Sequence, residues 1–215
     1  MRLSKRIKLF NNIDLYPVTA EPLSQGRTSL EILDGIIAGG AKIVQLREKE
    51  MPMAQLYELA VAFRRKTAEA GVLLIVNDHI DLALAVDADG VHLGQADFPL
   101  EPARKLAPEL IIGRSTHNLA QALEAQQQGA DYVNVGPIFP TGTKPEHKVF
   151  LGPEAIKDIA PHLQIPFTVM GGINADNIDL VVNAGARRIA VVTAVTKAPD
   201  VAQAVRDLRA RINKN

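Results

Sequence analysis

Short aliphatic segments alternate with longer segments of helical periodicity along nearly the whole chain, and this repeat constrains the fold more than any other feature of the sequence. Segments short and aliphatic enough to be strands buried on both faces lie at 14–18, 42–47, 73–77, 90–93, 110–114, 131–135, 167–170 and 188–192. Amphipathic segments between them lie at 29–38, 54–70, 119–128, 175–184 and 201–212. Repeated βα units of this kind predict an α/β fold, a parallel sheet that closes into a single (β/α)8 TIM barrel.

The chain length agrees with one barrel of this type. At 215 residues the chain can bury a substantial core, and single α/β barrels commonly occupy this size range. We therefore expect a single TIM-barrel domain over residues 1–215, in which residues 1–13 form an N-terminal extension ahead of the first strand.

The composition excludes several classes of partner. Lysine and arginine together number 24, as do aspartate and glutamate, so no net charge draws the chain to nucleic acid or to an anionic membrane. No apolar run approaches the roughly 20 residues of a membrane span, and the first residues lack the pattern of a secretory signal, so we expect a cytoplasmic protein. The absence of cysteine excludes thiolate metal ligands and a cysteine nucleophile, and leaves hard oxygen ligands available.

Polar residues collect where the predicted strands end. In a TIM barrel these positions, and the loops that follow them, face one common mouth at which the chemistry takes place. The second strand ends with Gln45, Arg47 and Lys49, and the alternation of side chains along a strand places all three on one side. Two cations beside an amide indicate an anion site. The alternative interpretation of Lys49 is a solvated basic residue.

Two aspartates follow neighbouring strands of the predicted barrel. Asp78 lies after the third strand and Asp97 after the fourth, so their carboxylates are candidates for sharing one Mg²⁺, with water and phosphate oxygens as the remaining ligands. The alternative role of either aspartate is to cap the helix that follows it. His79 and His92 have no spacing typical of a zinc site, and we interpret them as structural histidines.

Loops after the later strands are rich in groups that bind phosphate. Hydroxyls, glycine amides and a lysine occur at 141–144, which indicates an anion contact, although this segment also fits an ordinary exposed turn. Gly171 and Gly172 follow the seventh strand, at the usual monophosphate position of such barrels, although a double glycine also fits a tight turn. Two separate phosphate sites imply a reaction of two substrates, or one substrate with phosphate at both ends.

The order and placement of these motifs resemble the thiamine phosphate synthase family over nearly the whole chain. The motifs are LYPVT at 15–19, QLREK at 45–49, ND at 77–78, DGVHLGQ at 89–95 followed by Asp97, GPIFPT at 136–141 with Thr143 and Lys144, and GGI at 171–173. The resemblance implies a transferase that uses Mg²⁺ and acts on small phosphorylated substrates. Its reaction joins hydroxymethylpyrimidine diphosphate to thiazole phosphate, gives thiamine phosphate and pyrophosphate, and passes through a carbocation because the bond to diphosphate breaks first.

The matching positions imply a role for each site residue. Gln45 would hold the pyrimidine, and Asp78 and Asp97 would bind Mg²⁺. The diphosphate would be held by Arg47, Lys49, Asn77 and Lys144. The reacting centre and the phosphates would be lined by Ser115, Thr141 and Thr143. The thiazole phosphate would be received by Gly172 and by the backbone around Thr193 and Val195. The residues to which the resemblance assigns catalysis are Arg47, Lys49, Ser115 and Lys144.

The chain departs from the family pattern at three places. Ala96 stands where the family often has an acidic residue beside the metal-binding aspartate, Thr193 and Val195 replace a more usual serine and isoleucine, and an atypical Pro-Glu-His segment follows Lys144. None of these changes removes an implied ligand.

Two other functions fit parts of the same pattern. His117 lies near the end of the fifth strand, where the related thiazole tautomerases have a histidine that moves a proton, but that branch typically lacks the diphosphate and metal residues present here. A non-catalytic barrel that only binds a phosphorylated ligand would not need a pair of aspartates. The outer helices are also compatible with a homo-oligomer.

Overall fold

Eight short parallel strands form the centre of the molecule in a computed structural model that describes residues 1–142 and 149–214. Their bounds are β1 Leu15–Pro17, β2 Ile43–Leu46, β3 Leu73–Asn77, β4 Gly90–Leu93, β5 Ile111–Thr116, β6 Tyr132–Val135, β7 Phe167–Val169 and β8 Ile189–Val191. Each strand overlaps one of the segments predicted from the sequence, and nearly every strand residue is buried, as strands covered on both faces should be.

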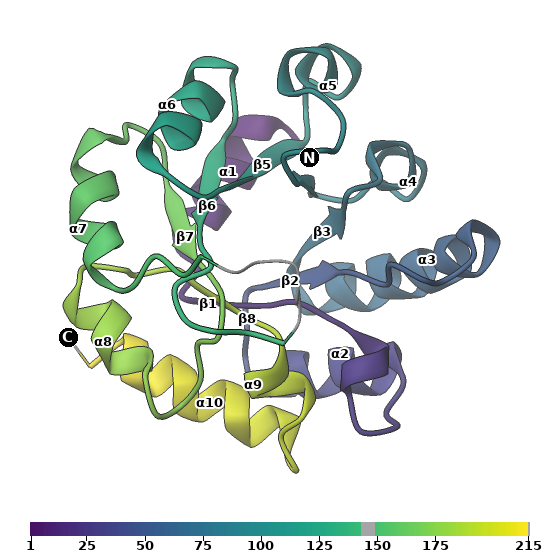
Figure 1. Cartoon of the computed structure of the whole chain (residues 1–215). Coiled ribbons are helices and arrows are strands. Elements are labelled where there is room, and N and C mark those ends of the chain that lie inside the picture. The colour runs from purple at the N-terminus through teal and green to yellow at the C-terminus, as the bar shows by residue number, and fades with distance from the viewer. Residues whose placement is uncertain (143–148, 215) are drawn as a thin grey trace.

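The sheet closes on itself. Its strand order is β1-β8-β7-β6-β5-β4-β3-β2, which leaves β1 and β2 as the two edges. These edges meet, because Val18 and Gln45 form a parallel bridge in which the Thr19 N–H donates to the Gln45 carbonyl at 2.9 Å. Figure 1 shows the resulting ring of strands along its axis, with the helices around it. The predicted single (β/α)8 TIM barrel is confirmed.

Helices follow the strands and cover the outside of the barrel. Their bounds are α2 Ser29–Ala38, α3 Met53–Ala70, α4 Ile80–Ala85, α5 Leu100–Leu106, α6 Leu119–Gln127, α7 Glu154–Ile159, α8 Ile178–Asn183, α9 Thr193–Thr196 and α10 Val201–Ile212, with 3-10 turns at Glu21–Leu23 and Ala160–His162. The segment predicted at 175–184 becomes helical only from Ile178, because the Asn174 N–H donates to the Asn177 side chain at 2.9 Å in a preceding turn. Among the described residues, no helix has the length and apolar composition needed to cross a membrane.

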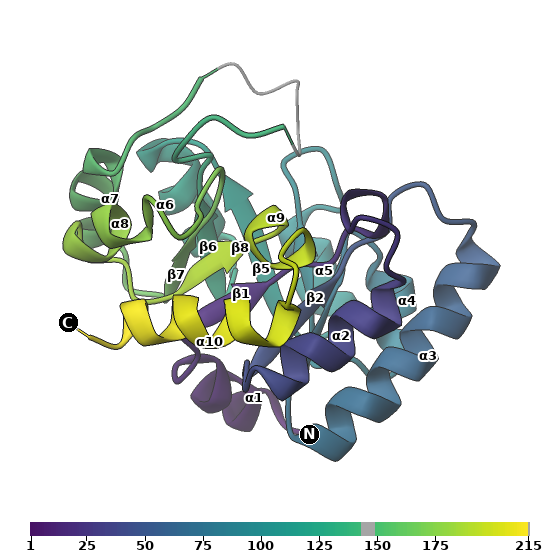
Figure 2. The same cartoon turned by 90° about the horizontal axis from the view of Figure 1, so that it is seen from below.

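One further helix, α1 (Leu3–Phe10), lies across the end of the barrel opposite α9, as Figure 2 shows. The sequence predicted this part of the chain only as an extension. The ring of Phe10 is fully buried, and its centroid lies 4.4 Å from that of Tyr132 inside the barrel. Arg6 is also buried; it donates to the Glu109 carbonyl at 2.6 Å and pairs with Asp89 at 3.4 Å. Helix α1 therefore closes this end of the barrel.

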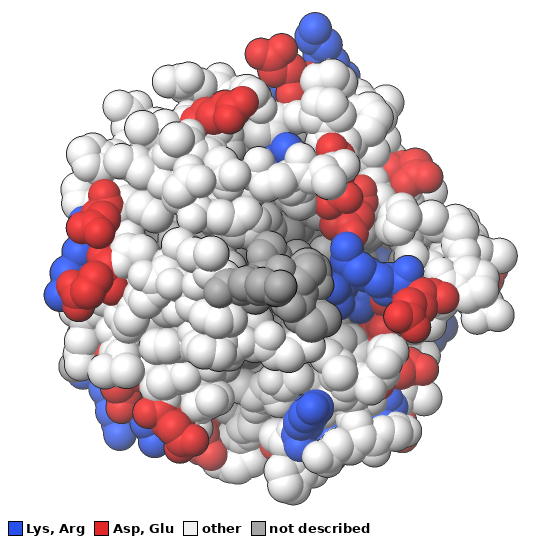
Figure 3. All heavy atoms as spheres, viewed as in Figure 1, with Lys and Arg blue, Asp and Glu red and all other residues white. Residues whose placement is uncertain are grey.

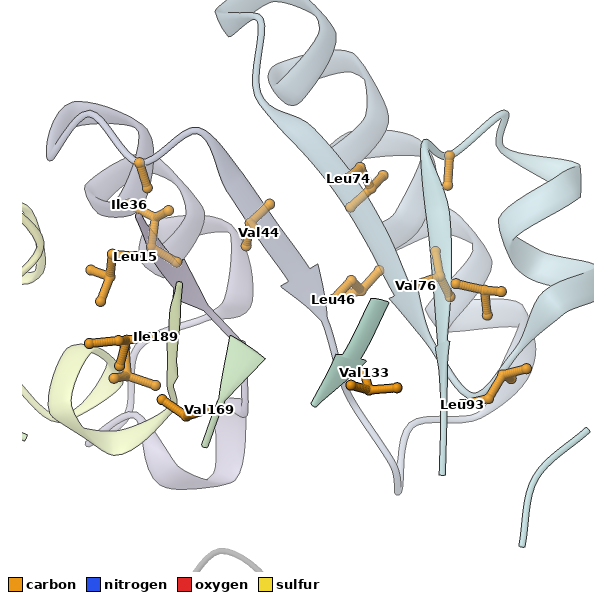
Figure 4. Packing of buried hydrophobic residues seen from close by; sticks show 14 of the residues in the cluster. Leu15, Ile36, Val44, Leu46, Leu74, Val76, Leu93, Val133, Val169 and Ile189 are labelled. Atoms are coloured by element: carbon orange, nitrogen blue, oxygen red, sulfur yellow. The ribbon is translucent and has the colours of Figure 1, made fainter. Parts of the chain in front are cut away.

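Alternation along the strands divides the hydrophobic core into two layers. On β2, Val44 and Leu46 point outward and pack under the helices, in the layer that Figure 4 shows, whereas Ile43 points into the barrel. The inner layer, which lies on α1, consists of Phe10, Ile13, Tyr16, Ile43, Leu73, Ile75, Ile111, Tyr132 and Ala190. The same alternation continues toward the strand ends, so it directs polar side chains such as Gln45 inward at the end opposite α1.

Asp14 joins the start of β1 to the last helix, α10. Its carboxylate accepts hydrogen bonds from Arg209 Nε at 3.0 and 3.1 Å and from Asn213 Nδ2 at 2.9 Å. Burial raises the pKa of Asp14, but these hydrogen bonds and the charge of Arg209 outweigh burial, so the pKa lies below its ordinary value. The ionised carboxylate therefore stabilises the fold above the ordinary aspartate pKa, and this contribution is lost as the pH falls through the lowered folded-state pKa.

We expect Asp14→Asn to lower the free energy of unfolding by about 2 kcal/mol at neutral pH, because charge-assisted hydrogen bonds are lost. Urea unfolding at neutral pH and in acid should show the difference from wild type shrinking as Asp14 becomes protonated. The control Asp34→Asn removes an exposed ion pair with Lys66 and should change the free energy by less than about 0.5 kcal/mol. A loss that is the same at both pH values would contradict the interpretation of Asp14.

Candidate active site

The strand ends surround a hollow of about 910 Å³, a volume that includes the solvent at its opening. The hollow lies at the carboxyl ends of the strands, where TIM barrels have their active sites. All eight strands contribute to its wall at or just beyond their ends, through Val18, Gln45, Asn77, His92, Ser115, Asn134, Met170 and Ala190 in strand order. Side chains that are far apart in the sequence can therefore act on one ligand.

Most residues that the sequence predicted for the site line this hollow. They are Gln45, Arg47, Lys49, Asn77, Asp78, Asp97, Ser115, Thr141, Gly172 and Thr193. The structure places Val195 elsewhere, because its side chain is fully buried in α9 and its N–H donates to the Val192 carbonyl at 3.0 Å. Thr143 and Lys144 lie outside the described residues.

Opposite charges meet on one side of the hollow. Lys49 Nζ lies 3.0 Å from Asp78 Oδ2, and the neighbouring Asp97 carboxylate accepts from the Gly94 N–H at 2.6 Å. Figure 3 shows basic and acidic side chains in contact near the centre of this face, on the side where β2 and β3 lie, whereas on the opposite side charged side chains stand only toward the outer rim. The Lys49 side chain is 48% exposed and that of Asp78 is 18% exposed, so the cation faces the mouth while the carboxylate is more enclosed.

The two carboxyl groups influence each other's protonation. Burial raises the pKa of Asp97, and the neighbouring Asp78 carboxylate raises it further. Burial also raises the pKa of Asp78, but hydrogen bonds from Asp97 and Lys49 outweigh this effect, so the pKa of Asp78 is lowered. This is the behaviour of two acids that are too close to ionise together without a compensating charge. A bound cation would supply that charge.

The donor set fits Mg²⁺. Asp78 and Asp97 are hard oxygen ligands in one enclosed place, as Mg²⁺ prefers. Within residues 1–142 and 149–214, no group of three or more histidine, cysteine or acidic side chains could hold a metal ion. A pair of carboxylates therefore has to be completed by water and by oxygens of the ligand, which is how Mg²⁺ is commonly bound next to phosphates.

The backbone holds Asp78 in an uncommon conformation at the end of β3. Its φ of 61° lies in the left-handed region, and the His79 N–H donates across it to the Asn77 carbonyl at 2.7 Å, which makes a tight turn. The Asp78 N–H donates to the His92 carbonyl on β4 at 2.8 Å. The turn therefore keeps Asp78 beside β4, the strand that leads to Asp97.

Four polar side chains from the inner faces of the strands form the floor of the hollow: Gln45, His92, Ser115 and Asn134. His92 Nε2 lies 2.9 Å from Ser115 Oγ, and Asn134 Oδ1 accepts from Thr168 at 2.7 Å. Sequence reasoning treated His92 as structural and did not single out Asn134. The available signal for Asn134 was one amide between two valines of a buried strand.

Glycines let the loop after β7 approach the loop after β6. Gly171 and Gly172 have φ values of 105° and 63°, which L-residues with a side chain rarely adopt. A Cβ on Gly172 would lie 2.3 Å from the Pro140 carbonyl oxygen, so this position leaves no room for a side chain. Thr193, the first residue of α9, also lines the hollow. The part of the lining formed by Gly171, Gly172 and Thr193 therefore offers backbone groups and a hydroxyl rather than charge.

His117 also lines the hollow, at the end of β5. Its Nδ1 lies 2.6 Å from the Gly136 carbonyl oxygen, which only accepts, so Nδ1 carries a proton. Its backbone N–H donates to the Gln121 side chain at 2.8 Å. The ring is therefore held between β5 and the loop after β6.

Comparison with known protein families shows which family the chain belongs to. The model of the family described as "Thiamine monophosphate synthase" matches residues 15–195, which extend from β1 into α9 and include all eight strands of the described sheet. The chain belongs to this family.

Relatives within the thiamine monophosphate synthase family cover almost the whole chain. The thiamine-phosphate synthase of Chloroflexus aurantiacus is 49% identical over 199 residues, which are 93% of this chain and 92% of that protein. That of Pelotomaculum thermopropionicum is 46% identical over 202 residues, which are 94% and 93%. A solved structure of thiamine phosphate pyrophosphorylase from Pyrococcus furiosus has a TM-score of 0.87 and 40% identity, and each chain is covered to 98%.

These relatives confirm the resemblance that the motifs indicated. The family's activity, thiamine phosphate synthesis, makes the chain a transferase of thiamine biosynthesis that acts on small phosphorylated substrates. Neither the tautomerase nor the non-catalytic barrel is favoured by these findings.

Proposed function

We propose that the hollow binds hydroxymethylpyrimidine diphosphate and thiazole phosphate side by side, and that this chain's charged residues drive the departure of pyrophosphate. The observation that carries the proposal is the placement of Arg47 and Lys49 in one hollow with the Asp78–Asp97 pair. A diphosphate requires cations that stay close to it, and a carboxylate pair among cations has a clear use when a divalent metal joins the ligand to the protein.

Departure of the diphosphate is the step that these residues would assist. As the bond between the pyrimidine methylene and the diphosphate oxygen breaks, negative charge grows on the leaving group. Arg47 and Lys49, held in a partly enclosed site, would stabilise that charge more in the transition state than in the ground state. Mg²⁺ held by Asp78 and Asp97 would add further positive charge against the diphosphate oxygens. The thiazole nitrogen then attacks the carbocation, so no side chain of the protein has to act as a nucleophile.

The remaining residues would hold the two reactants in contact. Gln45 and Ser115 on the floor would bind the pyrimidine, and Asn77 would contact the diphosphate. Gly172 and the backbone at Thr193 would receive the thiazole phosphate, whereas Val195, which is buried in α9 with its N–H bonded to Val192, would contribute only as part of the helix that Thr193 begins. The residues of the sixth loop proposed to contact the reacting centre and the diphosphate are Thr141, Thr143 and Lys144. Fixing both reactants in one site lowers the entropy cost of their encounter.

A coupled assay tests this function. With both precursors and Mg²⁺ we expect thiamine phosphate and pyrophosphate to form in equal amounts, and removal of the metal with EDTA should lower the rate by about 100-fold or more. Chromatography of thiamine phosphate and an enzymatic assay of pyrophosphate measure the two products. Turnover that persists after metal removal would contradict the role given to the aspartates.

The same preparation tests the tautomerase alternative. With thiazole phosphate alone, the proposed function predicts that the protein does not catalyse exchange of the ring protons with solvent. Rapid exchange that is abolished by His117→Ala would show that the chain is an isomerase and overturn the proposal.

The proposal extends to the setting of the enzyme. We place it in the cytoplasm, where phosphorylated precursors are retained, and we take residues 1–215, including α1, as one domain. A homo-oligomer stays a prediction that light scattering can test.

A further inference from the structure

A continuous series of hydrogen bonds runs through the barrel beneath the hollow. Gln45 Nε2 donates to Tyr16 Oη at 2.9 Å, and Tyr16 Oη lies 3.1 Å from Tyr132 Oη. Tyr132 Oη lies 2.9 Å from His92 Nδ1, and His92 Nε2 lies 2.9 Å from Ser115 Oγ. None of the five side chains is more than 8% exposed, and both ends of the series, Gln45 and Ser115, line the hollow. We call this series the interior hydrogen-bond chain.

The Gln45 amide gives the interior hydrogen-bond chain one direction. An amide nitrogen only donates, so the Tyr16 hydroxyl accepts a hydrogen bond from Gln45 and donates its own hydrogen bond to Tyr132. Tyr132 then donates to His92 Nδ1, and a neutral imidazole that accepts at Nδ1 carries its proton on Nε2. Nε2–H donates a hydrogen bond to Ser115 Oγ. The Ser115 hydroxyl proton is therefore left for an acceptor in the hollow.

The direction requires that both tyrosine hydroxyls keep their protons. Burial raises the pKa of Tyr16, and it raises the pKa of Tyr132 well above the ordinary value. Both groups are thus neutral at any pH at which the protein would work, and each has one proton to donate.

We propose that Tyr132 and Tyr16 are positioning residues for the pyrimidine ring. Tyr132 acts through His92 to present Ser115 as a hydrogen-bond donor, and Tyr16 holds the Gln45 amide nitrogen so that the amide oxygen is presented as an acceptor. The identity of that ring rests on the proposed function. The pyrimidine of thiamine carries an amino group, which donates, next to a ring nitrogen, which accepts. The Gln45 side-chain oxygen and the Ser115 hydroxyl complement these two groups.

The packing keeps Tyr132 fixed in this role. Its ring is fully buried, lies 4.4 Å from that of Phe10 between centroids, and stacks on His92 at 5.6 Å. Gly113 faces it across β5 and β6, and a Cβ at that glycine would lie 2.1 Å from Tyr132 Cζ. A ring enclosed on these sides holds its hydroxyl in one place, which is what precise support of a binding group needs.

The tautomer of His92 tests the direction in the substrate-free protein. NMR of ¹⁵N-labelled histidine in alkaline buffer distinguishes the two neutral tautomers, and His92→Gln identifies the signals of this residue among the five histidines. We expect the proton on Nε2 in wild type. Tyr132→Phe should give a mixture of tautomers, whereas Tyr16→Phe should not, because Tyr132 can still donate to His92. Tyr57→Phe makes the same change in an exposed residue of α3 and should have no effect.

Kinetics tests the positioning role. Tyr132→Phe is expected to raise KM for hydroxymethylpyrimidine diphosphate roughly tenfold, the scale of one lost hydrogen bond to a binding group, and to leave KM for thiazole phosphate within about twofold. Tyr57→Phe should match wild type in both. If Tyr132 had a merely structural role, its substitution would weaken the binding of both substrates to the same extent.

Several results would overturn the inference. A wild-type His92 with its proton on Nδ1 would reverse the chain, and a tautomer that Tyr132→Phe does not alter would remove Tyr132 from it. An unchanged KM for the pyrimidine substrate, or an equal rise in both KM values, would refute the positioning role. The NMR measurement needs no substrate, so failure of the proposed reaction would leave the tautomer result standing and the two failures can be told apart.

Discussion

Asp78→Asn lowers the turnover number by about 100-fold or more and raises the Mg²⁺ concentration needed for the half-maximal rate, if the carboxylate pair binds the metal as proposed. The substitution keeps the size of the side chain but removes its charge, which is also the partner of Lys49 at 3.0 Å. Asparagine tolerates the left-handed conformation at φ 61°, so the turn after β3 can stay as it is. Steady-state rates over a range of Mg²⁺ concentrations and calorimetric titration of the metal measure the effect.

Asp81→Asn provides the matched control. It makes the same chemical change three residues further along, at an exposed position in the first turn of α4. Its turnover should stay within about twofold of wild type, because surface charges away from a site contribute little. Circular dichroism checks that both variants are folded. Wild-type turnover and metal affinity in a folded Asp78→Asn variant would remove Asp78 from the site.

The barrel could be predicted from the sequence because its strands are buried on both faces and separated by helices. Such strands give unbroken aliphatic runs, and each βα unit repeats the same signal, so an error in one unit does not change the fold. The predicted bounds of the helices were less accurate than the predicted order of helices and strands. Helix α8 begins at Ile178 and not at 175, because a side-chain hydrogen bond of Asn177 forms a turn first.

The rim of the site could also be predicted, because a barrel brings all strand ends to one mouth. Asp78 and Asp97 were predicted to lie together on that ground, and both line the same hollow, where the Asp78 carboxylate contributes to the raised pKa of Asp97. The parts that were not predicted depend on contacts distant in the sequence. Helix α1 has little local signal of its role, since that role comes from Arg6 reaching Asp89 and Glu109. The position of Val195 follows from α9, a helix of one turn that periodicity cannot reveal.

Gly113 illustrates a constraint that becomes visible only when strand register is known. Its sequence context, between Ile112 and Arg114 in a predicted strand, suggests a weakened strand interior and no more. The strand register places Gly113 opposite Tyr132. The buried tyrosine ring occupies the space that a side chain at position 113 would fill. An added Cβ would lie 2.1 to 2.4 Å from three atoms of the Tyr132 side chain, two of the ring and the hydroxyl oxygen. The ring cannot retreat easily, because Phe10 packs against it.

We therefore expect Gly113→Ala to lower the free energy of unfolding by about 3 kcal/mol, since overpacking a closed core forces the ring or the strand to move. Gly142→Ala is the control, because its added Cβ meets none of the described atoms within 4 Å, and it should change stability by less than about 0.5 kcal/mol. Equilibrium unfolding in urea measures both variants.

A double variant, Gly113→Ala with Tyr132→Phe, separates two causes of the lost stability. It recovers part of the stability if the added methyl group collides with the hydroxyl end of the Tyr132 ring. It loses more stability if the ring as a whole is displaced. A Gly113→Ala variant as stable as Gly142→Ala would mean that the space beside Tyr132 is not filled as the structure has it.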